Sequence, residues 1–382
     1  MMKVQIDGVN TQNKGAELML VAILEEIESR FPGSKIAINP DSAFNKAFLD
    51  NYKLNIKRRG GLKFSRYIKA IAKRLKYHGD LGYFGEHYSG KQTTLLLDAS
   101  GFKYSDQWNR SKDWLDTKEK YYAKVKKNGT KLCFLTQAFG PFETPNGKRS
   151  VEILTRFCDL IFAREQKSYE YLINAGANPA KVIRSCDFTF KVKGVVPEKY
   201  SSLNGKVAVI PNYKMITHGG YKSSEYKDFL IKIISYLRSI GKGVFLLNHE
   251  GKNDLALCLE LKDAFEADIE VVSGLSAKEV KGIIGISSLV VSSRFHGVAS
   301  ALSQDVPCLA TSWNHKYEML FNDFGQKDNL ISAHDMWSAN KAKLDYQISS
   351  YKEIKNVLKE RKIQLLKEIE EMWDLIFRKH EI

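Results

Sequence analysis

The segment VVSSRFHGVA, residues 290–299, runs from an apolar strand directly into the start of a helix. A helix that begins here offers free backbone N–H groups and the positive end of its dipole. Arg294 adds a planar guanidinium that suits a carboxylate or phosphate, and His296 adds a group that exchanges protons near neutral pH. With Phe295 and Gly297, these residues predict an anion site beside an acid–base group. The alternative is a capped helix with a surface arginine and a hydrogen-bonded histidine.

Strands and helices alternate on both sides of this segment, which is typical of parallel strands joined by crossover helices. The fold class predicted is therefore α/β, with two doubly wound, Rossmann-like domains. The predicted strands are Lys3–Asp7, Ile36–Ile38, Thr93–Asp98, Lys131–Thr136, Leu160–Ala163, Val207–Ile210, Gly243–Leu247, Ile269–Val272, Leu289–Ser292 and Pro307–Ala310.

The domain boundary is predicted near residue 195, because the sequence becomes loop-like after Asp187. Residues 1–195 would form the N-terminal α/β domain and residues 196–340 the C-terminal one. Residues 341–382 show helical spacing without internal glycine or proline after Tyr351, so we expect a long helical segment that packs back on the domains. In paired α/β domains, ligands usually bind beyond the carboxyl ends of the strands.

Composition excludes several classes of protein. The chain has 382 residues, of which 43% are hydrophobic and 27% charged, so a disordered or fibrous chain is excluded. No apolar run has the length of a membrane span, and the first residues do not resemble a signal peptide. The five cysteines form no Cys-x-x-Cys pair, so neither disulfides nor a zinc site is expected and a cytoplasmic location is predicted.

Positive charge is concentrated in one place. Residues 51–80 hold ten Lys or Arg and one acid, which is +9 of the total net charge of +15. Within this segment, residues 62–77 have the spacing of a basic amphipathic helix. This pattern predicts peripheral contact with an anionic membrane face or with a phosphorylated lipid-linked substrate, and a nucleic-acid partner is disfavoured. A solvated helix packed on the core is the alternative.

Two further segments place polar residues where a strand ends. Arg164 follows the strand Leu160–Ala163 and could bind an anion, although Glu165 beside it could make it structural. The Gly/Asn-rich turn at residues 8–15 permits a tight strand-to-helix connection that could receive an anion or a sugar. Asn10 and Asn13 are its candidate ligands, and Asn13 could instead cap the helix.

Other strand ends supply weaker candidates. Asp98 and Ser100 could contact sugar hydroxyls or only cap a turn, and Gln137 could face the same cleft. Lys316 could neutralise a phosphate or simply be solvated. His249, followed by Glu250 and Asp254, resembles a metal cluster only loosely, so no metal site is predicted.

Together these motifs resemble the polysaccharide pyruvyl transferase family. The landmarks are the turn at residues 10–17, the segment 137–141, Ala163-Arg164-Glu165, Asp187 and, above all, residues 293–297 followed by Val306-Pro307. The chain departs from the family at two turns. It has Gly15-Ala16 where many members have Gly-Asp, and Asp98-Ala99-Ser100-Gly101 where many have a glycine-rich turn.

The resemblance implies a GT-B-like fold and an enzyme that forms a pyruvate ketal on a cell-envelope polysaccharide, exopolysaccharide or capsule, or on its lipid-linked precursor. Phosphoenolpyruvate would be the donor, with no cofactor and no metal. Arg294 and Arg164 would hold its anionic groups, and His296 would be the general acid or a phosphate ligand. The substrate-binding set would comprise Asn10, Asn13, Asp98, Ser100, Gln137, Phe295, Gly297, His249 and Lys316.

Two other functions fit the same residues. A GT-B glycosyltransferase would also place cations near the diphosphate of a nucleotide-sugar. A non-catalytic relative would bind polysaccharide through the same fold without turnover. Release of phosphate from phosphoenolpyruvate separates the first of these from ketal formation.

Overall fold

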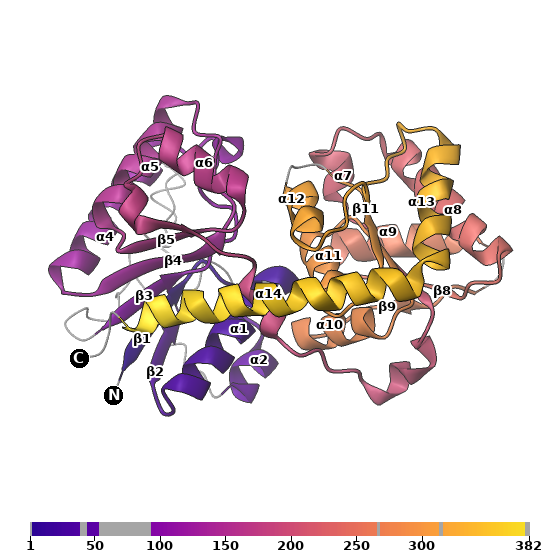
Figure 1. Cartoon of the computed structure of the whole chain (residues 1–382), viewed down its shortest axis with the longest axis horizontal. Coiled ribbons are helices and arrows are strands. Elements are labelled where there is room, and N and C mark those ends of the chain that lie inside the picture. Colours follow the sequence, from indigo (N-terminus) through magenta and orange to yellow (C-terminus); the bar gives the residue numbers. More distant parts are fainter. Residues whose placement is uncertain (1, 39–43, 53–92, 266–267, 313–315, 379–382) are drawn as a thin grey trace, which may run out of the picture. The chain divides into compact units, whose positions relative to one another are not determined.

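The chain divides into two compact units. The computed structural model describes residues 2–38, 44–52, 93–265, 268–312 and 316–378 (Figure 1). The first unit comprises Met1–Thr11, Ile23–Ser185 and Ile376–Ile382, and the second comprises Gln12–Ala22 and Cys186–Leu375.

The division falls after Ser185, earlier than the boundary predicted at residue 195. The reason is that the intervening residues are bound by a helix of the second unit. The buried Lys281 donates from Nζ to the carbonyl of Thr189 at 2.8 Å, and the Val195 N–H donates to the carbonyl of Lys278 at 2.9 Å.

The first unit is built on a parallel sheet with the order β2-β1-β3-β4-β5-β6 in the described ranges. Its strands are β1 (Lys3–Asp7), β2 (Lys35–Ile38), β3 (Leu95–Asp98), β4 (Lys131–Gln137), β5 (Leu160–Ala163) and β6 (Val182–Arg184). Its helices are α2 (Lys46–Asn51), α4 (Lys112–Lys127), α5 (Pro145–Phe157) and α6 (Gln166–Asn174), with the second half of α1 (Lys14–Arg30). Every residue of β3 and β5 is buried, as expected for parallel strands covered on both faces.

The second unit contains a parallel sheet with the order β11-β10-β7-β8-β9 among the residues described. Its strands are β7 (Val207–Ile210), β8 (Val244–Leu247), β9 (Val271–Val272), β10 (Leu289–Ser292) and β11 (Cys308–Ala310). Its helices are α7 (Lys214–Thr217), α8 (Ser223–Ser239), α9 (Gly251–Asp263), α10 (Ala277–Gly285), α11 (Phe295–Leu302), α12 (Lys316–Asp323), α13 (Trp337–Ser349) and most of α14 (Tyr351–Arg378). Figure 1 shows α9, α10 and α11 close to these strands.

The predicted fold class is confirmed, because both units are parallel α/β sheets and the C-terminal segment is helical. The short strand β6 was not predicted. The limit drawn at residue 341 falls inside α13, whose Leu344 is fully buried in the core of the second unit and therefore belongs to that domain.

Several sequence features can be placed on the structure and one cannot. All five cysteines are buried free thiols. In the part of the chain that is described, no helix has the length and apolarity needed to cross a membrane. Residues 53–92 lie outside the described residues, so the amphipathic helix at 62–77 and its membrane contact stay predictions.

Candidate functional site

The carboxyl ends of β7 and β10 mark the point where the chain order of the second sheet reverses. From β7 the chain proceeds to β8 and β9 on one side, and β10 and β11 lie on the other. Ligands of doubly wound sheets bind at such a switch point. The two strand ends are tied together there, because Asn212 donates from Nδ2 to the Ser293 carbonyl at 2.7 Å and Ser293 donates its N–H to Ile210 at 2.9 Å.

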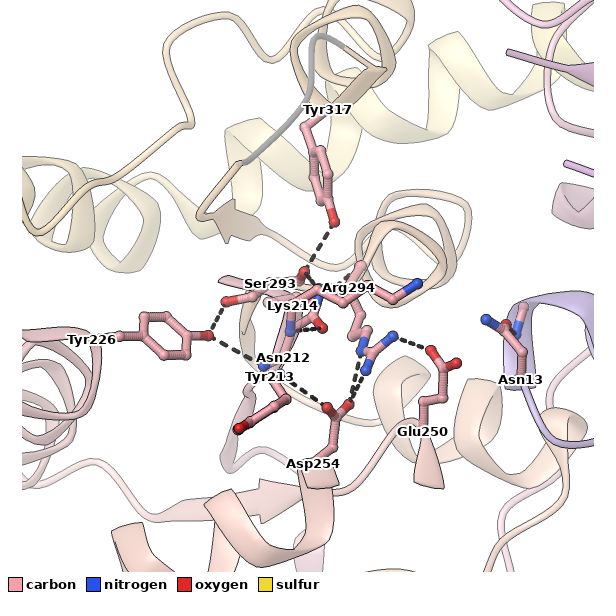
Figure 2. A network of polar contacts seen from close by, with 12 residues as sticks. Asn13, Asn212, Tyr213, Lys214, Tyr226, Glu250, Asp254, Ser293, Arg294 and Tyr317 are labelled. Atoms are coloured by element: carbon pink, nitrogen blue, oxygen red, sulfur yellow. Dashed lines mark hydrogen bonds and ion pairs between the residues drawn. The ribbon is translucent and has the colours of Figure 1, made fainter. Parts of the chain in front are cut away.

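Arg294 follows β10 and is held by two carboxylates, as Figure 2 shows. Its Nε lies 2.7 Å from Asp254 Oδ2 and its Nη2 lies 2.6 Å from the same oxygen, while Nη1 binds Glu250. Burial works to lower the pKa of Arg294, but Glu250 and Asp254 outweigh it and the pKa is raised. The guanidinium is thus a permanent, oriented cation.

Asp254 is the anchor of this cation. Its side chain is 1% exposed, and its Oδ1 also accepts the Tyr213 N–H at 3.0 Å. Burial raises the pKa of Asp254 although Arg294 acts to lower it. The two hydrogen-bonded oxygens fix the carboxylate, and through it the direction of Arg294.

His296 lies in the first turn of α11 and packs against the start of α1. A Cβ at Gly15 would lie 2.1 Å from His296 Nδ1, so only glycine allows this approach. On the other side of the ring, Nε2 lies 3.7 Å from Oδ2 of the buried Asp187. The arrangement suits a group that gives and takes a proton.

His249 follows β8 and is the second imidazole near Arg294. It is 4% exposed, and its Nδ1 has no hydrogen-bond partner among the described residues. Burial lowers the pKa of His249 well below its ordinary value, and the positive charges of Arg294, His296 and Lys14 add to the shift. His249 is therefore a neutral imidazole with a free ring nitrogen.

Three other predicted residues, two in this segment and one after β11, make packing contacts. Phe295 meets the rings of His296 and Tyr317 edge to face, at centroid distances of 5.3 and 5.8 Å. A Cβ at Gly297 would lie 2.5 Å from Ser292 Oγ, so glycine lets α11 lie close to the end of β10. Lys316 places its Nζ 5.3 Å from the centre of the Phe295 ring, a cation–π contact.

In the first unit, the predicted polar residues gather at the ends of β3 and β4. Asp98 and Gln137 are almost fully buried, and Asp98 Oδ1 accepts the Ser100 N–H at 3.0 Å. Asp98 Oδ2, Ser100 Oγ and Gln137 Oε1 are buried without a hydrogen-bond partner in the described ranges. Burial raises the pKa of Asp98, although Lys103 and Lys118 oppose the shift. This edge therefore offers oxygens that could accept hydrogen bonds from hydroxyls.

Arg164 and Asn10 also belong to the first unit, in contrast to Arg294. The Arg164 N–H donates to Gln137 at 3.0 Å, which joins the ends of β5 and β4. Glu165 caps α6, because its carboxylate accepts the N–H of Ser168 at 2.9 Å. The structure describes the two units separately, so a meeting of Arg164 with Arg294 stays a prediction.

Asn13 belongs to the second unit and caps α1, as its alternative interpretation predicted. Its Oδ1 accepts the N–H groups of Gly15 at 2.8 Å and Ala16 at 3.1 Å. Its backbone also forms an antiparallel bridge with Glu250. The cap fixes the turn that carries Gly15 against His296.

Sequence reasoning did not find the partners of the two key residues. Glu250 and Asp254 were considered only with His249 as a loose metal cluster, whereas both bind Arg294. Asp187 was noted as a family landmark but not as a partner of His296. The spacing of Glu250 and Asp254 gave a signal, because the N-cap residue of α9 and a residue four positions later lie on the same side of the helix start.

Comparison with known proteins places the chain in a family. Residues 13–315 match the family model for polysaccharide pyruvyl transferase. The chain belongs to the polysaccharide pyruvyl transferase family. The resemblance inferred from its motifs is thereby confirmed, and membership makes the protein a transferase that acts on polysaccharide. The matched range contains Asn13, Arg164 and the Arg294–His296 segment. No curated protein sequence is significantly similar to the chain.

Solved structures with a similar fold include sugar-nucleotide enzymes. HepE of Anabaena in complex with UDP has a TM-score of 0.60 at 11% identity, covering 98% of this chain and 99% of HepE. A glycosyltransferase of Rickettsia africae has a TM-score of 0.59 at 12% identity, covering 100% and 99%. UDP-GlcNAc 2-epimerase of Methanocaldococcus jannaschii, in complex with UDP-GlcNAc and UDP, has a TM-score of 0.55 at 12% identity, covering 91% and 93%. Identities this low show the GT-B fold alone.

Proposed function

We propose that this transferase moves the pyruvyl unit of phosphoenolpyruvate onto two hydroxyls of a sugar, forms a cyclic ketal and releases phosphate. The sugar would belong to a cell-surface polysaccharide or its lipid-linked precursor. The observation that carries the proposal is the oriented Arg294 cation with His296 beside it, at the switch point of the second sheet in a chain of this family.

Donor binding in this scheme uses cations. Phosphoenolpyruvate carries a carboxylate and a phosphate, and a guanidinium can bind either with parallel N–H donors. Among the described residues, each Nη atom of Arg294 contacts one carboxylate, and each Nη carries two N–H groups. Arg164 would supply the other cation from the first unit, and the neutral His249 would offer its free Nδ1.

The chemical steps need one proton donor and two hydroxyls. His296 would protonate the methylene carbon, so that C2 becomes an oxocarbenium-like centre. A sugar hydroxyl attacks C2 and gives its proton to His296, which restores the imidazole to its starting state. The C2–O bond to phosphate then breaks, the second hydroxyl bonds to C2 to close the ketal, and its proton leaves with the phosphate. Asp98, Ser100 and Gln137 would accept hydrogen bonds from the sugar hydroxyls. No metal or organic cofactor takes part in this scheme.

The deciding experiment measures inorganic phosphate released from phosphoenolpyruvate across a panel of lipid-linked and nitrophenyl glycosides. We expect release that depends on one acceptor class, with a product heavier by the ketal group in mass spectrometry. A parallel panel of nucleotide-sugars serves as the control. Release of UDP there, without phosphate release from phosphoenolpyruvate, would assign the protein to glycosyl transfer instead.

A further inference from the structure

The two carboxylates on Arg294 differ in how firmly they are held. Asp254 is 1% exposed, contacts both Nε and Nη2, and is itself bound by the Tyr213 N–H. Moving it would leave a buried charge and a buried N–H without partners, which is costly. Asp254 is therefore a fixed part of the arginine's position.

Glu250 is held much less firmly. Its side chain is 23% exposed, and its carboxylate contacts only Nη1 of Arg294 among the described residues. It is the N-cap residue of α9, yet its side chain accepts no helix N–H. Rotation of its side chain would break one contact and leave the backbone bridge to Asn13 intact. Figure 2 shows Glu250 and Asp254 on separate nitrogens of the guanidinium.

The different mobility of Glu250 and Asp254 affects anion binding because both side chains are negatively charged. Two carboxylates surround one guanidinium, so this pair of contacts carries one net negative charge before any ligand arrives. Glu250 already occupies the position beside Nη1 that an incoming phosphate or carboxylate would take. The two negative charges repel strongly where water is partly excluded. Once Glu250 rotates outward, Nη1 has both N–H groups available and Asp254 still holds the arginine.

We infer that Glu250 and Asp254 act in opposite directions on anion binding at Arg294: Asp254 positions the guanidinium, and Glu250 occupies the place of the incoming anion until it is displaced. This inference rests on the proposed function in one respect, namely that the anion is the donor substrate. Glu250 thereby sets the affinity for the donor, and Asp254 is a positioning residue.

The test titrates inorganic phosphate and phosphoenolpyruvate into the full-length protein by calorimetry. Glu250→Gln should tighten binding of both anions roughly fivefold, the effect of removing one partly exposed competing charge. Asp254→Asn should weaken binding tenfold or more, since the arginine loses its buried counter-charge and turns to Glu250. Glu260→Gln is the matched control, because Glu260 lies in α9 and does not contact Arg294. Its carboxylate pairs instead with Lys227, with 3.1 Å between Oε2 and Nζ.

Opposite signs for the two site variants, with Glu260→Gln unchanged, support the inference. Equal or weaker binding by Glu250→Gln overturns it, and this holds even if Asp254→Asn fails to fold. The variant Arg294→Lys separates anion binding by Arg294, which belongs to the proposed function, from the competing role of Glu250. If Arg294→Lys loses phosphate binding while Glu250→Gln leaves it unaltered, Arg294 binds anions and only the role of Glu250 is wrong. If the parent protein binds neither anion, the proposed function fails as well.

Discussion

The carboxyl edges of the two sheets share one architecture and differ in chemistry. At the first edge, Asp98, Ser100 and Gln137 present buried oxygens, three of which have no hydrogen-bond partner in the described ranges. At the second edge, Arg294 and two imidazoles present side-chain nitrogens, and the guanidinium is paired with Glu250 and Asp254. An oxygen-rich edge suits the hydroxyls of a sugar. The second edge, called the cationic edge here for its guanidinium, suits an anionic donor that can displace one of the paired carboxylates.

This difference arises from a few side chains after the strands and not from the sheets. Both sheets are parallel, and the inner strands β3 and β10 are buried and almost wholly apolar, so the two edges are built on the same kind of scaffold. A parallel α/β unit therefore sets where a ligand binds, and the residues just after the strands set which ligand it is. Three substitutions test this division between the two edges.

The largest effect is expected at the cationic edge. His296→Asn keeps a polar side chain of similar size but removes the proton donor, so kcat should fall ~10²- to 10⁴-fold. The dissociation constant for phosphoenolpyruvate should stay near the parent value, because Arg294 and Asp254 are untouched. Phosphate release and calorimetry measure the two quantities. A parent-like kcat would remove His296 from the chemistry.

A smaller effect is expected from Gly15→Ala. The new Cβ would lie 2.1 Å from His296 Nδ1, so the imidazole must move. Misplacement of a catalytic group by about 1 Å costs up to roughly 100-fold in rate, and we expect a loss of about 10- to 100-fold in kcat. The melting temperature, read beside the rate, shows whether α1 still folds. A variant with unchanged kcat and an intact fold would mean that the position of His296 is not critical.

The smallest effect concerns the oxygen-rich edge and is a change in stability. Burial raises the pKa of Asp98, so the folded state binds the proton more tightly than the unfolded chain does. Stability from this group is present below its ordinary value of 3.8 and is lost as pH rises through the raised pKa. Asp98→Asn removes this destabilisation, because an amide does not ionise. The melting temperature of the variant at pH 7 should exceed that of the parent by roughly 2–4 °C.

This gain should vanish near pH 3, where the parent carboxyl is protonated in both states. Asp116→Asn is the control with the opposite sign, because the hydrogen bond from Arg149 lowers the pKa of Asp116 and ionisation there stabilises the fold. Calorimetric scans at the two pH values measure both variants. A parent-like or lower melting temperature for Asp98→Asn at pH 7 would show that the buried carboxylate has a compensating partner.

The sequence alone predicted the alternation of elements, most strand positions and the family. Apolar strand segments such as Val207–Ile210 and Leu160–Ala163 appear in the structure at the predicted residues, because a short buried run bounded by turn residues has few alternatives. It also singled out Arg294 and His296, since residues that follow a buried strand face the ligand edge. The division into compact units after Ser185 involves a contact between Lys281 and residues far earlier in the chain, which no local pattern contains.

Local patterns therefore determined which residues form strands and helices and which side chains carry charge at their ends. Only the tertiary structure decided the strand order, and with it that β7 and β10 are neighbours at the switch point. It alone assigned Asp254 and Glu250 to Arg294, and Gly15 and Asp187 to His296. The physical reason is sequence separation. Helix and strand periods extend over a few residues, whereas packing brings Asp254 to Arg294 across 40 residues and Gly15 to His296 across 281.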